Sequence, residues 1–225
     1  MALDEALLAD DAPRPTLRFY TWCPSALSLG YFQRWAEFEP LAGKAQLVRR
    51  FSGGGAIHHA DELTFSIAAP LAHPLYRGEV KSSYERVHVV LARAFEALGV
   101  RARLRGDERL ASDRVSSGMC FHRSTPLDLA WDGAKGVGSA QRRTKQRVLH
   151  HGSIKLGRTA LEEGVACLRT HAPDVSAEDL ADSIATLCAA AWSIAWERSE
   201  PTPAEQRHAE RRAPFYTSTE FVRRR

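Results

Sequence analysis

The spacing of apolar residues divides the chain into helical and extended stretches. Between Lys81 and Leu98 apolar side chains recur every three or four positions, which is the spacing of an amphipathic helix, and Gly99 is a natural stop. Ser176, followed by acidic residues, is a good N-cap for a later helix with an apolar face. The predicted helical stretches are residues 2–8, residues 81–98, the residues from 159 as far as the prolines at 201 and 203, and residues 204–212.

Shorter stretches rich in β-branched and aromatic residues predict strands. They are 17–22, 46–50 and 63–67, and the stretch 119–153 reads as a run of short strands joined by tight turns. Strands dominate the first two-thirds of the chain, with one helix at the centre and helices at the end. We therefore predict an α+β fold, a single domain over residues 1–225 in which a mostly antiparallel β-sheet is covered by α-helices.

Composition narrows the class of protein. A chain of 225 residues, 44% of them hydrophobic, is long enough to bury a substantial core. No apolar run approaches the roughly 20 residues that a membrane helix needs. The first residues carry acids where a signal peptide carries bases. We therefore expect a cytoplasmic protein that does not associate with membranes.

The formal net charge of +4 favours acidic partners. A basic cluster between Arg142 and Arg147 and three arginines at the end of the chain contribute to it. Nucleic acid is not the expected partner, because aromatic residues are not interleaved with the basic ones as a stacking platform requires. An acidic carrier protein fits the same charge.

The four cysteines predict neither disulfides nor a metal site. None of them forms a Cys-x-x-Cys pair, so the spacing of a zinc site is absent. Cys167 and Cys188 lie in sequence segments rich in Ala and Leu, which favours buried, inert thiols. Cys23 precedes a proline and has no neighbourhood that indicates chemistry. Cys120 alone has surroundings that favour a reactive role.

Three consecutive glycines, Gly53–Gly55, follow the predicted strand that ends at Arg49 and Arg50. Glycines allow positive φ angles and let backbone N–H groups approach a ligand, so this loop can cradle an anion. The alternative is a flexible hairpin turn. His58 and His59 come next, and adjacent strand positions face opposite ways. At most one of them can join a given site, so we do not expect a metal site built from this pair.

The stretch from Met119 to Ser153 concentrates residues suited to chemistry. Cys120 and Lys135 flank a predicted strand and turn, and small residues around them would let a backbone approach a ligand. A lone cysteine before phenylalanine is nevertheless more often a core thiol, and a lone lysine in a turn is usually solvated. These residues alone leave both readings open.

Three motifs together resemble the lipoate–biotin protein ligase and octanoyltransferase superfamily. Residues Arg49–His59 are similar to the family's Arg-Arg-x-Ser/Thr-Gly-Gly-Gly-Ala motif with its downstream histidine. Residues Lys135–Gln141 resemble its Lys-x-x-Gly-Ser-Ala motif, and His150–Ser153 resembles the His-Gly-Ser/Thr strand that follows. Their order and spacing agree with the family, and the likeness covers almost the whole chain. It implies the catalytic-domain fold of biotin and lipoate ligases and a role in protein lipoylation.

The resemblance also implies a set of site residues. Cys120 would be the catalytic nucleophile, and the ammonium of Lys135 would favour its thiolate form. Backbone N–H groups of the glycine loop or near Gly138 would form an oxyanion hole. His59 and His151 would position groups or move protons, while His58 and His150 would be packing or solvent residues. The residues implied in substrate binding are Arg50, Ser52, Gly53, Gly54, Gly55, His59, Gly138, Ser139, Ala140, His151 and Gly152, with no metal ligand.

Within the superfamily the chain is most similar to the Cys-dependent octanoyltransferase, or lipoyl amidotransferase, branch, which carries Cys-Phe near Cys120. The alternative is an ATP-dependent lipoate–protein ligase using ATP and Mg. Such ligases carry Gly-Arg-Asn-Asp near the place of Arg105–Glu108 and often add a C-terminal domain. The sequence departs from the family at Gly136 and at Lys155, which falls in a strand that is commonly aliphatic. It also starts within what is usually the first helix.

The implied reaction moves an octanoyl or lipoyl group from a carrier thioester to Cys120 and then to a lysine of a lipoyl domain, without a cofactor. The implied partners are acyl carrier protein and lipoyl-domain proteins, namely the glycine cleavage H protein and E2 subunits of 2-oxoacid dehydrogenases. Acyl carrier protein and an octanoylated lipoyl protein both remain open as donors. A non-catalytic carrier-binding or nucleic-acid-binding protein with the same fold is a third hypothesis.

Overall fold

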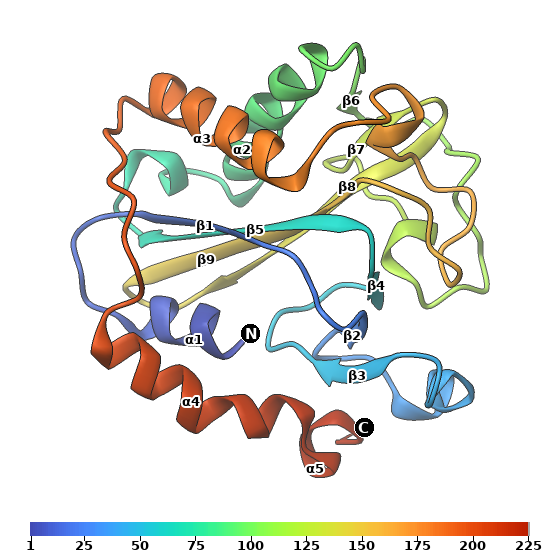
Figure 1. Cartoon of the computed structure of the whole chain (residues 1–225), viewed down its shortest axis with the longest axis horizontal. Helices are drawn as coiled ribbons and strands as arrows, with labels where there is room; N and C mark the ends of the chain where they lie inside the picture. Colours follow the sequence, from blue (N-terminus) through green and yellow to red (C-terminus); the bar gives the residue numbers. More distant parts are fainter. Residues whose placement is uncertain (225) are drawn as a thin grey trace.

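A six-stranded sheet occupies the centre of the computed structural model, which describes residues 1–224 (Figure 1). Its strands lie in the order β1-β5-β9-β8-β7-β6, and each neighbouring pair is antiparallel. The strands are β1 (Thr16–Tyr20), β5 (Glu62–Pro70), β6 (Arg103–Leu104), β7 (Leu129–Trp131), β8 (Ala134–Arg143) and β9 (Arg147–Lys155). The predicted α+β class with a mostly antiparallel sheet is confirmed.

A smaller sheet lies beside one end of the large one, in the order β3-β2-β4. It consists of β2 (Ala26–Leu29), β3 (Gln46–Arg49) and β4 (Ile57–His59). β2 pairs with β3 in parallel and with β4 antiparallel. The glycine loop connects β3 to β4, so the small sheet carries this loop at the edge of the large sheet.

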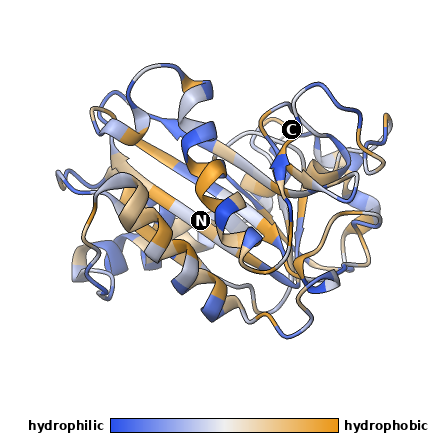
Figure 2. Cartoon of the chain, turned by 90° about the horizontal axis from the view of Figure 1, so that it is seen from above, coloured by the Kyte–Doolittle hydropathy of each residue, from blue (hydrophilic) through white to orange (hydrophobic). Residues whose placement is uncertain are grey.

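Helices cover both faces of the large sheet (Figure 1). They are α1 (Ala2–Ala9), α2 (Val80–Glu96), α3 (Ala177–Trp192), α4 (Pro203–Thr217) and α5 (Thr219–Val222), with 3-10 turns η1 (Trp35–Glu37), η2 (Glu39–Leu41), η3 (Pro74–Tyr76), η4 (Cys120–His122) and η5 (Leu168–Thr170). α2 and α3 pack on one face, and α1 and α4 lie on the other. In Figure 2 the hydrophilic residues gather in loops and on outer sides of helices, as amphipathic helices require. None of the helices described is both long and apolar enough to cross a membrane.

The two faces of the large sheet differ because side chains alternate along a strand. On β5, Leu63, Phe65 and Ile67 join the main apolar core under α2 and α3. The intervening Glu62 and Thr64 face the other side, where both are buried among polar partners. One face of the sheet therefore forms the core and the other forms a polar pocket.

Two predictions about local structure were wrong. The predicted helix from 159 to the prolines at 201 and 203 is present only as α3: residues 159–176 are not helical, apart from the turn η5, and neither are residues 193–202. The backbone of residues 159–176 bonds to the sheet instead: Ala166 N–H donates to the Lys135 carbonyl at 3.1 Å and Arg169 N–H to the Leu156 carbonyl at 2.9 Å. The stretch 119–153 does not consist of short strands only, because β8 has 10 residues and β9, which starts within the stretch, has 9. The helix after Ser176 begins as predicted, with the Ser176 hydroxyl accepting from Asp179 N–H.

Candidate active site

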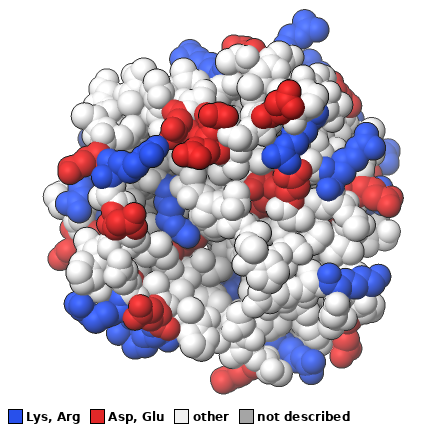
Figure 3. All heavy atoms as spheres, viewed as in Figure 1, with Lys and Arg blue, Asp and Glu red and all other residues white. Residues whose placement is uncertain are grey.

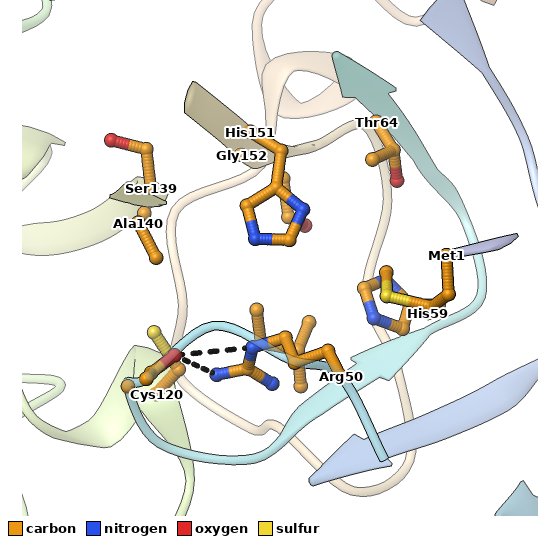
Figure 4. A pocket seen from close by; sticks show the side chains of 14 residues that line it. Met1, Arg50, His59, Thr64, Cys120, Ser139, Ala140, His151 and Gly152 are labelled. Carbon is orange, nitrogen blue, oxygen red and sulfur yellow. Dashed lines mark hydrogen bonds between the residues drawn. The ribbon is translucent and has the colours of Figure 1, made fainter. Parts of the chain in front are cut away.

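A pocket lies between the large sheet and the glycine loop, with about 400 Å³ of space that is partly open to solvent. Figure 4 shows Cys120 at one end of it and Met1, His59 and Thr64 at the other. The predicted residues that line it are Arg50, Gly53, Gly54, His59, Cys120, Gly138, Ser139, Ala140, His151 and Gly152. Ser52, Gly55 and Lys135 lie behind this lining and support it. The structure thus brings all the predicted site residues into one region.

Cys120 is held where η4 begins by contacts with the glycine loop. Its N–H donates to the Ala56 carbonyl at 2.7 Å, and Ala56 N–H donates to the Gly118 carbonyl at 2.9 Å. Any side chain at Gly55 would place a Cβ 2.8 Å from Cys120 N, so glycine is required for this approach. The Cys120 N–H is already bonded and cannot serve an oxyanion.

Lys135 is the cation beside the Cys120 thiol. It lies in β8, is 2% exposed, and its Nζ is 3.5 Å from Cys120 Sγ. Nζ also donates to the Cys120 carbonyl at 3.0 Å and forms an ion pair with Asp128 at 2.8 Å. Burial alone would lower the pKa of Lys135, but the facing Cys120 and Asp128 raise it above its ordinary value. With both of these groups facing it, Lys135 is therefore a positive charge rather than a base.

Gly138 gives Lys135 and Cys120 the space to meet. A Cβ on Gly138 would lie 2.9 Å from Lys135 Cε, 3.1 Å from its Nζ and 3.3 Å from Cys120 Sγ. The glycine of the Lys-x-x-Gly-Ser-Ala motif thus has a steric reason in this chain. Ala140, the next residue on the same side of β8, lines the pocket with a methyl group and so takes up little of its space.

Arg50 shapes the glycine loop rather than reaching into solvent. Arg50 is 3% exposed, and its guanidinium donates to the carbonyls of Ser28 and Gly55 and, as Figure 4 shows, twice to that of Gly53. Within residues 1–224, the N–H groups of Gly53, Gly54 and Gly55 donate to no acceptor of the chain. Since the Gly53 and Gly55 carbonyls are turned to Arg50, the N–H groups of the loop have no partner in this part of the chain; that they bind an anion stays a prediction.

His59 is fixed by partners on both ring nitrogens. Its Nδ1 lies 2.6 Å from a Glu62 oxygen and its Nε2 2.7 Å from the Ser28 hydroxyl, and Trp22 stacks on the ring. The Glu62 carboxylate can only accept, so Nδ1 carries the proton and Nε2 accepts from Ser28. Burial lowers the pKa of His59 although Glu62 opposes this. A neutral, anchored ring suits positioning better than proton transfer.

His151 repeats this arrangement on β9. Its Nε2 is 2.6 Å from the Ser52 hydroxyl, and its Nδ1 is 3.8 Å from Asp4. Burial lowers the pKa of His151 below its ordinary value, although Asp4 opposes this shift. Asp4, which lies in α1 and is fully buried, was not anticipated from the sequence. Its only signal is an acidic residue on the apolar side of the first predicted helix.

The Ser139 side chain points away from the pocket (Figure 4). Its hydroxyl lies 2.8 Å from His88 Nε2 and 3.0 Å from His150 Nε2, on the α2 side of the sheet. His88 Nδ1 must donate to the Leu127 carbonyl at 2.5 Å, so its Nε2 accepts from Ser139. Ser139 therefore lines the pocket with its backbone only, and its side chain belongs to a buried network. His150, predicted to be a packing or solvent residue, is fully buried.

Lys155, the departure from the family pattern, is neutralised by two acids. Its Nζ forms ion pairs with Glu62 at 2.9 Å and Glu162 at 2.7 Å and donates to the His58 carbonyl at 2.8 Å. All three charged side chains are fully buried. Burial opposes the charge, but Glu62 and Glu162 raise the pKa of Lys155 above the ordinary range. Neither Glu62 nor Glu162 was identified from the sequence.

The basic cluster 142–147 is only partly a surface feature. Arg147 is buried and donates to the carbonyls of Leu7 and Ala12, so it holds α1 to the sheet. Arg142 and Lys145 are exposed. On the face shown in Figure 3, basic and acidic side chains are intermixed around a central hollow. The described residues contain no group of three His, Cys, Asp or Glu that could hold a metal ion.

Comparison with known proteins agrees with this geometry. A sequence model of the "Lipoyl protein ligase A/B catalytic domain" family matches residues 1–194. The octanoyltransferase LipM of an Exiguobacterium species is 40% identical over 167 aligned residues, which cover 69% of this chain. The match spans only 60% of that protein's length. The octanoyltransferase LipM of Kyrpidia tusciae is 33% identical over an alignment that covers 98% of this chain and 92% of that protein.

The fold has close counterparts among solved structures. Lipoate-protein ligase A bound with ATP is similar to this chain with a TM-score of 0.79, over 99% of this chain and 92% of that chain. The sequences are 22% identical, so this likeness establishes the fold alone.

Proposed function

Since the chain belongs to the lipoyl protein ligase A/B catalytic domain family, we propose that it is an acyltransferase of protein lipoylation. It moves an octanoyl, or lipoyl, group from a carrier thioester to a lysine of a lipoyl domain through a thioester on Cys120. The named octanoyltransferases among its relatives support this activity over that of an ATP-dependent ligase. The fold does not separate the two, because a ligase bound with ATP shares it.

One observation carries the proposal. Cys120 Sγ lies 3.5 Å from the buried ammonium of Lys135, at the end of a pocket of about 400 Å³. A positive charge this close favours the thiolate, which is the nucleophilic form of cysteine. A core thiol has no need of a charged lysine or of a pocket. Cys167 and Cys188 illustrate that case: both are buried, and burial raises the pKa of Cys188 to about 12.

In the first step the Cys120 thiolate attacks the carbonyl carbon of the donor thioester. A carbon–sulfur bond to Cys120 forms, the bond to the carrier's sulfur breaks, and the carrier leaves as a thiolate that takes up a proton. The two thioesters are of similar energy, so this exchange needs no nucleotide. The N–H groups of Gly53–Gly55 and the Lys135 ammonium are the donors available for the oxyanion.

In the second step an uncharged lysine amine of the acceptor attacks the Cys120 thioester. The new carbon–nitrogen bond replaces the carbon–sulfur bond, Cys120 leaves as a thiolate beside Lys135, and the amine's extra proton passes to the thiolate or solvent. An amide replaces a thioester, so the step is downhill. The acyl chain would extend from Cys120 along Gly138, Ala140 and Gly152 toward Thr64, which line one wall of the pocket.

We propose acyl carrier protein as the donor and lipoyl-domain proteins as acceptors, among them the glycine cleavage H protein and E2 subunits. No cofactor enters either step, because both are exchanges at an acyl carbon. The reaction suits the cytoplasm, where carrier and acceptor would both be available.

A transfer assay tests the proposed function. Octanoyl-acyl carrier protein and an apo lipoyl domain are mixed with the protein without ATP, and the lipoyl domain is followed by mass. We expect octanoylation of its lysine, and none with Cys120→Ala. Lipoylation that requires free lipoate, ATP and Mg²⁺, and that survives Cys120→Ala, would instead make the protein a ligase.

A further inference from the structure

Asp128 is a buried carboxylate to which the two steps above assign no role. It is 4% exposed, and its Oδ2 is 2.8 Å from Lys135 Nζ. The same oxygen accepts from Thr125 N–H at 2.6 Å, and the Asp128 carbonyl accepts from Arg105 N–H at 2.8 Å. The carboxylate is therefore held in place by the backbone on both sides, independently of Lys135.

The contacts of Lys135 show how Asp128 orients the ammonium group. An ammonium has three N–H bonds. Asp128 and the Cys120 carbonyl, at 2.8 and 3.0 Å, take two of them. The third is left for Cys120 Sγ at 3.5 Å or the Arg123 carbonyl at 3.4 Å. Asp128 thus holds the ammonium beside the reacting sulfur, with one N–H left for the sulfur or the Arg123 carbonyl.

The charge around Lys135 changes during the reaction. Before acylation the ammonium faces two groups that can be negative, the Cys120 thiolate and Asp128. Once Cys120 carries an acyl group, its sulfur is uncharged. Asp128 is then the remaining carboxylate within ion-pair distance of Lys135 among residues 1–224. A buried ammonium without a counter-ion loses its proton readily, because burial disfavours the charged form.

We propose that Asp128 is a positioning residue that keeps Lys135 charged and directed at the thioester while Cys120 is acylated. Its contribution then falls on the second step, in which R–CO–S–Cys120 and the acceptor amine give R–CO–NH–lysine and the Cys120 thiol. The first step depends on it less, because the thiolate itself can hold Lys135 there. This inference rests on the proposed acyl transfer through Cys120.

The other charged groups around Lys135 cannot replace Asp128. Lys155 of β9 lies across the Phe121 ring, 4.5 Å from its centroid, and is itself positive. His88 of α2 is neutral, because burial lowers its pKa. The titratable groups that raise the pKa of Lys135 are Cys120 of η4 and Asp128 of the loop before β7.

The experiment separates the two steps in Asp128→Asn, which keeps the size of the side chain and an acceptor for Thr125 N–H. Octanoyl-acyl carrier protein loads Cys120, and the adduct is followed by intact mass. Nα-acetyl-lysine is then added as a small acceptor that needs no protein docking. We expect loading within about three-fold of the wild type and aminolysis slowed about ten-fold at neutral pH, the loss of one charge-assisted contact.

The pH dependence is the readout that a merely structural role would not change. Without Asp128 the pKa of Lys135 in the acyl-enzyme falls, so the ratio of variant to wild-type aminolysis rates should decrease from about pH 6.5 to about pH 9. Asp128→Glu, which keeps the charge, should restore a flat ratio even if its rate is lower. Asp132→Asn is the matched control, because this exposed acid pairs with His171 at 2.6 Å, away from Lys135.

Equal slowing of both steps in Asp128→Asn, or a rate ratio that does not vary with pH, would overturn the inference. If Asp128→Asn does not fold, Asp128→Glu and the wild type still decide it: a pH-dependent loss of aminolysis in Asp128→Glu contradicts the role of the charge. Absence of an adduct on the wild-type protein would contradict the proposed function instead, so the two failures are distinguishable.

Discussion

The two faces of the large sheet, at strands β5, β8 and β9, bury polar groups in different ways. On the side of α2 and α3 the polar exceptions, Ser139, His88 and His150, are uncharged, and each hydrogen meets an acceptor. On the pocket side the buried groups are ions, with Lys155 between Glu62 and Glu162. Buried ion pairs contribute little to stability compared with apolar packing. The helix side therefore contributes more to the stability of the sheet, and the pocket side holds its buried charges.

Two glycines of β8 provide the sharpest way to break this comparison. Gly138→Ala would place a methyl against Lys135 and Cys120, and we expect acyl transfer to fall about 100-fold, the effect of misplacing reacting groups by about 1 Å. Gly136→Ala would place its Cβ 1.9 Å from Trp131 in the apolar core, so we expect a loss of about 1–3 kcal/mol in unfolding free energy. Single-turnover rates and urea unfolding of both variants check this. A Gly136→Ala protein that is fully stable, or a fully active Gly138→Ala, would contradict the division.

Ser139→Ala tests whether the helix-side network is structural. The change leaves His88 Nε2 and His150 Nε2 without their shared partner, and an unsatisfied buried polar group costs about 1–3 kcal/mol. We expect unfolding free energy to drop by that amount, while the transfer rate per folded molecule stays within about three-fold. Denaturant titration combined with an active-site count separates the two quantities. A loss of rate without a loss of stability would assign the Ser139 hydroxyl to the chemistry.

Acid should weaken the helix side before it weakens the carboxylates of the pocket side. Burial, reinforced by His88, lowers the pKa of His150 well below its ordinary value. Below about pH 6.5 the unfolded chain therefore binds a proton that the folded chain does not. The unfolding free energy decreases as the pH is lowered through this range. Glu62, whose pKa is lowered by His59 and Lys155 despite burial, contributes stability that is lost only below about pH 4.3.

His150→Gln is the variant that checks this order. It should reduce the slope of unfolding free energy against pH between about pH 6.5 and about pH 5 by up to one proton. His59 and His151, whose pKa values are lowered by burial, act in the same direction, so part of the slope remains. Urea titrations across this range measure it. An unchanged slope would mean that His150 is protonated in the folded protein.

The exposed basic residues at the turn between β8 and β9 should have the smallest effect. Arg142→Glu, at the end of β8, combined with Lys145→Glu, in the turn, reverses two solvent-exposed charges outside the pocket and the apolar core. If acidic carriers dock near this turn, KM for acyl carrier protein should rise about two- to five-fold at low salt, and the difference should vanish at high salt. Steady-state kinetics at two ionic strengths provide the test. An unchanged KM places docking elsewhere.

The sequence predicted most of the helices, several strands and most of the pocket lining, because local patterns and three motifs determine them. It missed the irregular stretch 159–176, whose backbone is held by the sheet rather than by a helix. It did not predict the partners of the charged residues. Asp128, Glu62 and Glu162 are brought to Lys135 and Lys155 by strand pairing and loop packing that no local pattern records. The face to which Ser139 points follows from the register of β8, which the many small residues around it conceal.

The central claim is that Cys120 forms an acyl thioester without ATP. Intact-protein mass after mixing with octanoyl-acyl carrier protein, in wild type and Cys120→Ala, tests it most directly. We expect one octanoyl adduct on the wild type that hydroxylamine removes, and none on the variant. An adduct of equal size on Cys120→Ala, or no adduct at all while a lipoyl domain is still acylated, would contradict the account.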